Sequence, residues 1–156
     1  MKKLILIFLF IVTTATAQKS ITVVQDVKLL TYENSHGLTA PTLDFIVKYN
    51  GLKIKELNIN LCYERANLFN SIYNKYSIDF WSYNLPIVKK VKLKPMMNIG
   101  AIYRFNTIYY TYGFASNLSY KISNSTSLIL LSTIDKRNDI GNEYRFNNYL
   151  GLKFKL

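Results

Sequence analysis

The chain of 156 residues has few of the residue types that build covalent or metal-bound structure. It has one cysteine, Cys62, and one histidine, His36. A single cysteine excludes a disulfide within the chain, and we expect Cys62 to be a small packed side chain. His36 lies in the polar stretch NSHGLTAP, where no second histidine or cysteine could complete a metal site. We therefore expect a solvated loop histidine and no cofactor.

Motifs of catalysis and of helical structure are also missing. The chain has no phosphate-binding loop, no metal-ligand spacing and no nucleophile motif. It shows no convincing helical period, and after residue 18 no apolar run reaches the length of a transmembrane helix. The composition is nevertheless 49% hydrophobic and 15% aromatic. This apolar side-chain area must therefore be used in strands.

One apolar run does occur, at the start of the chain. Lys2 and Lys3 precede an apolar stretch at 4–12, and the small residues Ala15-Thr16-Ala17 follow it. This order is typical of a secretory signal peptide, and the apolar stretch is too short to span a bilayer as a helix. We expect residues 1–17 to be a signal peptide, cleaved after Ala17, and residues 18–156 to form one exported domain.

Acidic residues are scarce, with 9 against 20 Lys and Arg. Removing Lys2 and Lys3 with the signal lowers the net charge from +11 to +9. Such an excess favours nucleic acid or an anionic membrane surface, and export argues against nucleic acid. The densest basic run, VKKVKLKP, predicts a rim of solvated lysines at a strand entry, or contact with lipid phosphates or an acidic periplasmic partner. This basic rim comprises Lys89, Lys90, Lys92 and Lys94.

Alternation of apolar and polar residues between turn signals predicts eight strands. They lie near 21–33, 42–50, 52–66, 74–84, 89–105, 108–122, 126–136 and 144–156. Asn50-Gly51 predicts a type I′ hairpin turn, and Lys55-Glu56 a β-bulge. Tight turns are expected at Asn106-Thr107 and at 123–125. Longer connections are expected at 34–41, 67–74 and 137–143.

Three of the strands have a clear two-sided pattern. In 108–122, Tyr110, Tyr112, Phe114 and Leu118 share one face, and Thr111, Gly113 and Ala115 share the other. Segment 89–105 places Ile99 and Tyr103 opposite Asn98 and Arg104. Segment 42–50 places Phe45 and Val47 opposite Asp44 and Lys48. The phases of 21–33, 74–84 and 126–136 are ambiguous, and their faces stay unassigned.

Three observations favour a membrane barrel over a soluble one with the same alternation. Several strands span 12 to 17 residues, whereas strands of globular proteins have about five or six. With an even number of strands and both termini in the periplasm, most outward connections are the longer ones. Aromatic residues gather at two depths, as interfacial girdles do, with aliphatic residues between them. We predict an all-β fold, an eight-stranded antiparallel up-and-down transmembrane β-barrel, whose narrow interior is filled by side chains.

The last residues, NYLGLKFKL, keep strand alternation to the final position, which is expected if the last strand pairs with the first. Tyr149, Gly151, Phe154 and Leu156 also resemble the C-terminal signature of bacterial outer-membrane β-barrel proteins, although phenylalanine is commoner in the final place. The resemblance implies recognition by the barrel assembly machinery. The mature chain is similar to small eight-stranded outer-membrane barrels, and its composition to those of Bacteroidetes-type bacteria. This implies a monomer in the bacterial outer membrane, surrounded by its lipid and lipopolysaccharide.

The strand phases place Glu64, Arg104 and Arg145 in the outer third of the barrel, where they could form one interior ion cluster. Three functions remain open. The first is a non-enzymatic barrel, porin-like only in architecture, with a structural or surface-binding role. The second is a lipid-modifying enzyme, such as a lipid A acyl hydrolase, which would need His36 beside a nucleophile. The third is a soluble, lipocalin-like periplasmic binder with its apolar face turned inward.

Overall fold

The computed structural model describes residues 19–27, 44–54, 57–68, 71–80 and 84–156. The expected signal peptide and the connection at 34–41 with His36 lie outside these ranges, so they stay predictions. Residues 55–56 also lie outside them, but Ile54 and Leu57 on either side pair as ends of two different strands, so the bulge predicted within one strand at Lys55-Glu56 is wrong. Within the ranges, no helix combines the length and the apolar character needed to cross a bilayer.

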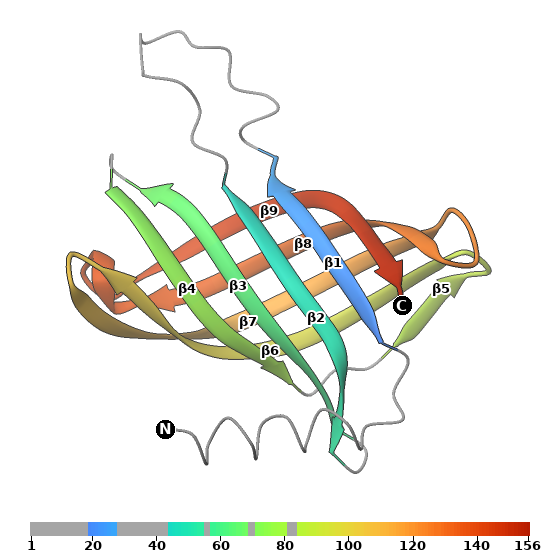
Figure 1. The fold of residues 1–156 in the computed structure, drawn as a ribbon, viewed down its shortest axis with the longest axis horizontal. Coiled ribbons are helices and arrows are strands. Elements are labelled where there is room, and N and C mark those ends of the chain that lie inside the picture. Colours follow the sequence, from blue (N-terminus) through green and yellow to red (C-terminus); the bar gives the residue numbers. More distant parts are fainter. Residues whose placement is uncertain (1–18, 28–43, 55–56, 69–70, 81–83) are drawn as a thin grey trace, which may run out of the picture.

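The described chain consists of strands and one short helical turn (Figure 1). The strands are β1 (Ser20–Asp26), β2 (Phe45–Ile54), β3 (Leu57–Leu68), β4 (Ser71–Phe80), β5 (Leu85–Val88), β6 (Val91–Arg104), β7 (Thr107–Lys121), β8 (Thr126–Arg137) and β9 (Glu143–Lys155). A 3₁₀ turn, η1 (Asn138–Ile140), connects β8 to β9.

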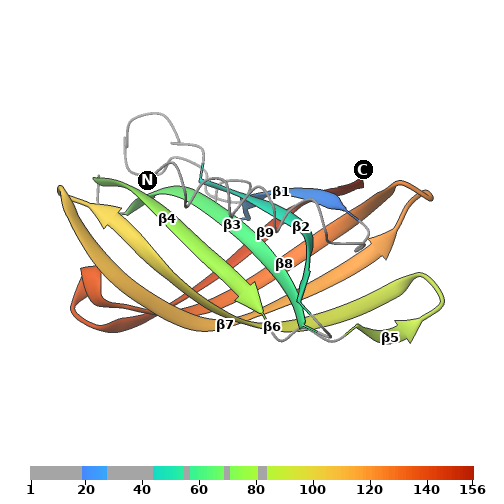
Figure 2. The ribbon, with the colours of Figure 1, turned by 60° about the horizontal axis from the view of Figure 1, so that its bottom comes forward.

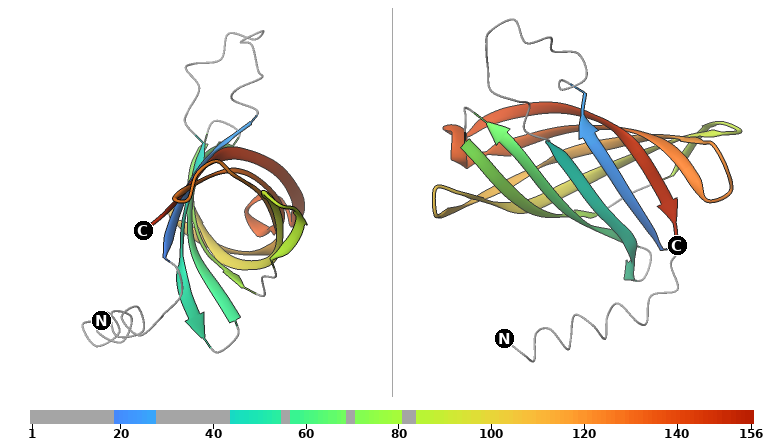
Figure 3. Two further views of the ribbon diagram at one scale, coloured as in Figure 1. Left: turned by 90° about the vertical axis from the view of Figure 1, so that its right-hand side faces the viewer. Right: turned by 45° about the horizontal axis from the view of Figure 1, so that its top comes forward.

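Eight of the strands form a closed antiparallel barrel. Neighbouring strands pair in order from β1 to β4 and from β6 to β9. In addition β1 pairs with β9, and β4 pairs with β6 from Asn74–Tyr103 to Phe80–Met97. The view along the barrel shows the resulting ring (Figure 3). The short β5 pairs only with β6 and lies outside the ring of eight. The predicted fold class is therefore confirmed, with β5 as an addition.

The two ends of the barrel differ in what they carry. We call the end where β1 starts and β9 finishes the terminal end, and the opposite one the far end. At the far end, Phe105 and Asn106 join β6 to β7, with φ of 51° and 57°. Positive φ at both central positions is the requirement of a type I′ turn. The turn was expected one residue later.

Two predicted connections are wrong. Asn50-Gly51 does not end its strand, because β2 continues to Ile54, which pairs with Leu57. The register instead shifts between Asn50 and Leu52, and glycine suits such a bulge as well as it suits a turn. The expected long connection at 67–74 is also absent, since Leu68 pairs with Ser71.

The expected difference in loop length between the two ends is only partly present. The terminal-end connection between β4 and β6 contains β5 and is not short, and two far-end connections hold two residues each. The remaining turns agree with the prediction. Ile122 to Ser125 join β7 to β8, one residue more than the turn expected at 123–125, and η1 with Gly141 (φ 77°) lies between β8 and β9.

The assigned strand faces agree with the structure. On β7, Phe114 is 59% exposed on the outer surface, and Thr111, on the opposite face of the same strand, is 1% exposed in the lumen. On β6, Ile99 faces outward and Asn98 inward; on β2, Lys48 faces inward. Apolar side chains therefore cover the outer surface of the barrel.

The lumen is not uniformly polar. One buried apolar cluster contains Val24, Ile46, Met96, Ala115, Ile129, Leu131 and Tyr149. A second contains Ala66, Tyr73 and Ile102, with Tyr109 packed against it. Charged residues share the lumen with these clusters, which is why the alternation in several strands was ambiguous.

Gly151 allows β9 to approach β1 closely. A Cβ atom at this position would lie 2.0 Å from the carbonyl oxygen of Val23 and 2.6 Å from Cα of Val24. Backbone atoms cannot yield as a flexible side chain would. The glycine is therefore required at the junction of the first and last barrel strands.

We expect Gly151→Ala to destabilise the folded barrel by about 1–3 kcal/mol, the usual cost of overpacking. The measurement is urea unfolding in phospholipid vesicles. Gly141→Asn is the matched control, because nothing lies within 4 Å of a Cβ placed there and asparagine tolerates positive φ. Equal stability of Gly151→Ala and the wild type would contradict the close approach.

Candidate functional site: the charged lumen and its two rims

A buried ion pair joins β2 to β4 inside the barrel. Lys48 Nζ lies 2.7 Å from Asp79 Oδ2, and the residues are 3% and 2% exposed. The Cys62 thiol on β3 donates a hydrogen bond of 3.2 Å to the same carboxylate oxygen. Cys62 is thus a packed side chain that also helps to solvate a buried charge.

A second buried pair reaches across the lumen. Lys75 Nζ on β4 lies 2.5 Å from Asp135 Oδ2 on β8 and 3.7 Å from Glu64 Oε2 on β3. Asn98 Nδ2 on β6 donates a 2.8 Å hydrogen bond to the other oxygen of Asp135. Four strands from opposite walls of the barrel therefore meet at one lysine and its acids.

Glu64 extends this network toward the far end through two tyrosines. The hydroxyls of Tyr73 and Tyr149 both donate to Glu64 Oε1, the latter at 3.1 Å. Arg145 Nη1 donates a 2.9 Å hydrogen bond to the Tyr73 hydroxyl. Glu64 and Arg145, two members of the hypothesised ion cluster, are thus joined by the Tyr73 hydroxyl.

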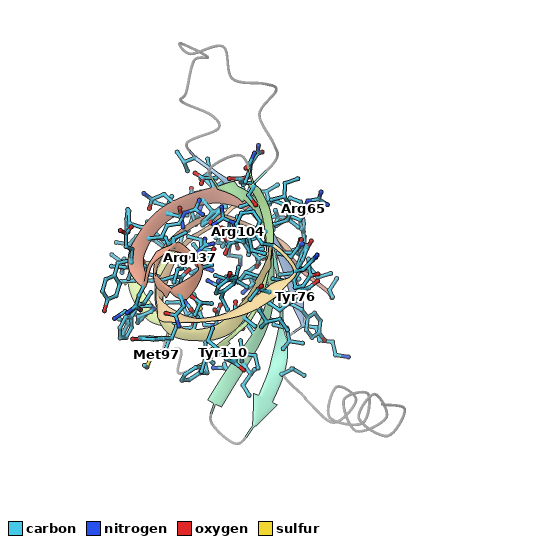
Figure 4. All side chains as sticks on the ribbon, turned by 90° about the vertical axis from the view of Figure 1, so that its left-hand side faces the viewer. Arg65, Tyr76, Met97, Arg104, Tyr110 and Arg137 are labelled. Carbon is cyan, nitrogen blue, oxygen red and sulfur yellow. The ribbon has the colours of Figure 1, made fainter. Side chains whose placement is uncertain are left out.

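The third member, Arg104, belongs to the far-end rim. Its Nη1 lies 3.3 Å from Asp139 Oδ2 on η1, and Arg137 Nη2 lies 2.7 Å from the same oxygen. The guanidinium of Arg137 also lies 4.1 Å from the centre of the Tyr73 ring. Arg104 therefore connects to Glu64 through Asp139, Arg137 and Tyr73. Figure 4, viewed from the far end, shows both arginines within the ring and Tyr76, Tyr110 and Met97 outside it.

Asp139 lies beyond the strands, so the balance of charges at this rim can be read from its pKa. Burial alone would raise the pKa of Asp139. The hydrogen bonds and charges of Arg137, with those of Arg104, outweigh burial and hold the pKa below its ordinary value. Asp139 is therefore ionised at neutral pH and ties the two arginines to the connection between β8 and β9.

The sequence did not identify Lys75, Asp79 or Asp135 as members of the lumen. All three lie in the two segments whose phase was ambiguous. Their strands have apolar residues on both faces; on β8, for example, Ile129 is buried and Leu130 is 38% exposed. On β4 the charged residues themselves were the available signal, because Lys75 and Asp79 share one phase of the strand.

Side chains fill the charged part of the lumen. A cavity of about 10 Å³ lies among the described side chains of this network, lined by Lys48, Glu64, Lys75, Asp79, Asn98 and others. Such a volume holds one water molecule at most. In the ranges that the structure describes, no group of three or more His, Cys, Asp and Glu residues could hold a metal ion. The packing of these side chains favours a rigid lumen over one that passes solutes.

The outer surface carries an apolar belt with aromatic rings toward both ends. At the far end the exposed rings are Tyr76, Tyr103, Phe105, Tyr110, Tyr112, Tyr144 and Phe146. Tyr120 and Phe154 are exposed toward the terminal end. Ile78, Ile99, Leu130, Leu150 and Leu152 lie exposed between them, together with the ring of Phe114. Aromatic rings above and below a mostly aliphatic zone are the pattern that a bilayer selects.

The basic rim lies at the terminal end. Lys89 and Lys90 form the turn between β5 and β6, and both are exposed. Lys92 is exposed on β6, and Lys94, two residues further into the barrel, is half-buried. The rim thus begins on the surface and continues into the mouth of the barrel.

The residues of the C-terminal signature occupy both faces of β9. Tyr149 is fully buried in the lumen, where its hydroxyl binds Glu64, and Gly151 adjoins β1. Phe154 and Leu156 are exposed on the outer surface, at 42% and 69%. Recognition by the assembly machinery stays a prediction.

Solved structures of outer-membrane barrels have a similar architecture. The structure is similar to the Yersinia pestis outer-membrane protein Ail in a phospholipid bilayer nanodisc, with TM-score 0.56 and 14% identity over 90% of this chain and 99% of Ail. A crystal structure of Ail gives TM-score 0.50 and 12% identity over 90% and 97%. The fold is that of a small outer-membrane β-barrel.

A designed protein shares this barrel. The designed protein TMB2.3 gives TM-score 0.50 and 12% identity, with 92% of this chain and 97% of that chain covered. No family model matches the sequence, and no curated protein matches it. At these identities the similarities concern the fold, and the function has to come from the residues of the barrel itself.

Removing one partner of the Lys48–Asp79 pair should destabilise the barrel strongly. Lys48→Met leaves the Asp79 charge buried without its cation, which costs about 3–5 kcal/mol. Lys48→Met combined with Asp79→Asn removes both charges and should lose less stability than the two single changes together. A double-mutant cycle of urea unfolding in vesicles measures the coupling.

The control for this cycle is Lys19→Met, because Lys19 is exposed at the terminal end. An exposed lysine should change the stability by about 0.5 kcal/mol or less. Additive effects of the Lys48 and Asp79 substitutions would show that the two charges do not depend on each other in the folded barrel.

Proposed function

We propose that this chain is an exported, monomeric, non-enzymatic β-barrel of the bacterial outer membrane, with the terminal end in the periplasm. The observation that best supports a membrane location is the apolar belt on the outside of a closed barrel whose lumen is charged and filled by side chains. In a lipocalin-like soluble barrel the apolar phase would face inward. In this barrel Phe114 and Ile99 are more than half exposed, whereas Lys48 and Asp135 are buried.

The rest of the proposal depends on the sequence. The N-terminal pattern supports a signal peptide cleaved after Ala17, and the resemblance of the composition supports a Bacteroidetes-type source. Outer-membrane lipid and lipopolysaccharide are then the surroundings of the belt, and the barrel assembly machinery its route into the membrane. A lipid-modifying activity would depend on His36, which lies outside the described residues.

Within the envelope, the filled lumen supports a structural or surface-binding role over transport. Binding would take place at the far end, which carries the arginines of the rim and the exposed ring of Phe105. The similar Yersinia pestis protein is described as an attachment invasion locus protein, and attachment through the far end is the surface-binding role we propose.

Fractionation of cells that express the full sequence tests this proposal. We expect the protein in the outer-membrane fraction, with faster electrophoretic mobility in detergent before boiling than after it, because a closed barrel resists opening until heated. The matched variants are Leu130→Arg on the outer belt and Lys136→Gln, an outward cation beside Tyr144 at the far end.

Arginine on the lipid face near the bilayer centre costs about 2–4 kcal/mol. The faster band of the unboiled sample, which reports the folded barrel, should therefore weaken in Leu130→Arg and persist in Lys136→Gln. Recovery of the wild type as a soluble periplasmic protein, or an unchanged band in Leu130→Arg, would contradict the membrane location.

A further inference from the structure

Two turns at the terminal end come together to form an open cleft. The turn between β5 and β6 and the turn between β7 and β8 both project past the end of β9 at the terminal end of the barrel (Figures 1 and 2). The Lys121 amide donates a 2.9 Å hydrogen bond to the Lys90 carbonyl, which fixes the turns side by side. The cleft has a volume of about 470 Å³ and is lined by Lys89, Lys90, Lys121, Ile122, Ser123 and Asn124. We call it the lysine cleft.

The lysine cleft has a strong excess of positive charge. Lys89, Lys90 and Lys121 are all exposed, and none forms a salt bridge with another described residue. Segments 84–94 and 116–134, which build this end of β5 to β8, contain no aspartate or glutamate. The acids of the described barrel that form salt bridges lie in its middle and at its far end. Three ammonium groups with no carboxylate partner among the described residues form a site for an anion.

Apolar side chains are exposed on the strands and turns that carry this charge. Leu85, Ile87 and Val88 on β5 are 48%, 56% and 60% exposed. Tyr120 and Ile122 beside the cleft are 46% and 57% exposed, and they continue into the apolar belt of the barrel. A soluble anion would contact the lysines alone. An amphiphile would contact the lysines with its charged group and the neighbouring apolar side chains with its chains.

We propose that the lysine cleft binds the phosphodiester headgroup of an anionic phospholipid, in the leaflet that meets the terminal end. This inference rests on the proposed function, since it needs a barrel that spans the membrane. The ligand class follows from the charge. A phosphatidylglycerol headgroup carries a net negative charge, whereas the choline of phosphatidylcholine neutralises its own phosphate. Asn124 can donate to phosphate oxygens beside the lysines.

Native mass spectrometry of the detergent-solubilised protein, titrated with phosphatidylglycerol, tests the site. The cleft variant carries Lys90→Gln and Lys121→Gln, which leave the backbone hydrogen bond between these residues intact. The control variant carries Arg65→Gln and Lys136→Gln, which remove the same charge from the outer face toward the far end. Each lysine near a membrane surface contributes about fivefold in affinity for anionic lipid. The first phosphatidylglycerol should therefore bind the cleft variant about 25-fold more weakly, and the control like the wild type.

Parallel titrations identify the source of the anion. Phosphatidylcholine, inorganic phosphate and a glutamate-rich peptide should each bind more weakly than phosphatidylglycerol, with little difference between the cleft variant and the control. Equal losses in both variants would show a general charge effect and overturn the site. Tighter binding of inorganic phosphate or of the acidic peptide would overturn the lipid assignment.

The heat-sensitive mobility of each variant in phosphatidylcholine vesicles separates the two proposals. A barrel that inserts into these vesicles but shows no preference for phosphatidylglycerol overturns the lysine cleft alone. A wild-type chain that fails to insert overturns the proposed function and the cleft with it.

Discussion

The pairing of β4 with β6 closes the sheet, and the other features of the molecule depend on that closure. An open sheet would present a row of unpaired amide and carbonyl groups at each edge, which hydrocarbon cannot solvate. In the closed ring each of the eight strands has a partner on both sides. Closure also divides the side chains into two groups, because successive residues of a strand point to opposite faces. One group meets the bilayer and the other is confined to a narrow lumen.

Confinement explains why the lumen is built from paired charges. A buried lysine or carboxylate without a partner is strongly destabilising. Lys48 is neutralised by Asp79, and Lys75 lies between Asp135 and Glu64. The hydroxyls of Tyr73 and Tyr149 complete the coordination of Glu64. Because these contacts connect strands on opposite walls, the described side chains pack across the middle of the lumen. The same arrangement that stabilises the barrel therefore argues against transport.

The sequence predicted the fold from the strands in which the two faces differ most. In β6 and β7 most outward residues are apolar, and most inward ones are small or polar, apart from Met96 and Ile102 on β6. Both strands and both faces were therefore predicted correctly. The prediction was incomplete where the lumen itself is apolar. Val24 and Leu131 are buried in the lumen beside exposed Val23 and Leu130, which removes the alternation from β1 and β8.

The errors in the connections have a related cause. The polar residues between positions 67 and 74 look like a loop, but some of them belong to the far-end rim; Ser71, for example, accepts a hydrogen bond from Nε of Arg104. Asn50-Gly51 has the composition of a turn and the position of a bulge. The members of the ion network on β4 and β8 were missed because contacts between distant strands leave no local pattern in the sequence.

The two ends of the barrel also differ in the charged side chains that they carry. Lysines without described acidic partners lie at the terminal end, and arginines tied to Asp139 lie at the far end. The central claim is that the face between these ends meets lipid. Spin labels placed singly along the outward positions of β7 test it most directly, in a Cys62→Ser background reconstituted in bilayer vesicles. The account predicts that labels at Tyr112, Phe114 and Leu118 collide with membrane-dissolved oxygen more often than with a water-soluble nickel complex. A higher collision rate with the nickel complex at these positions would contradict it.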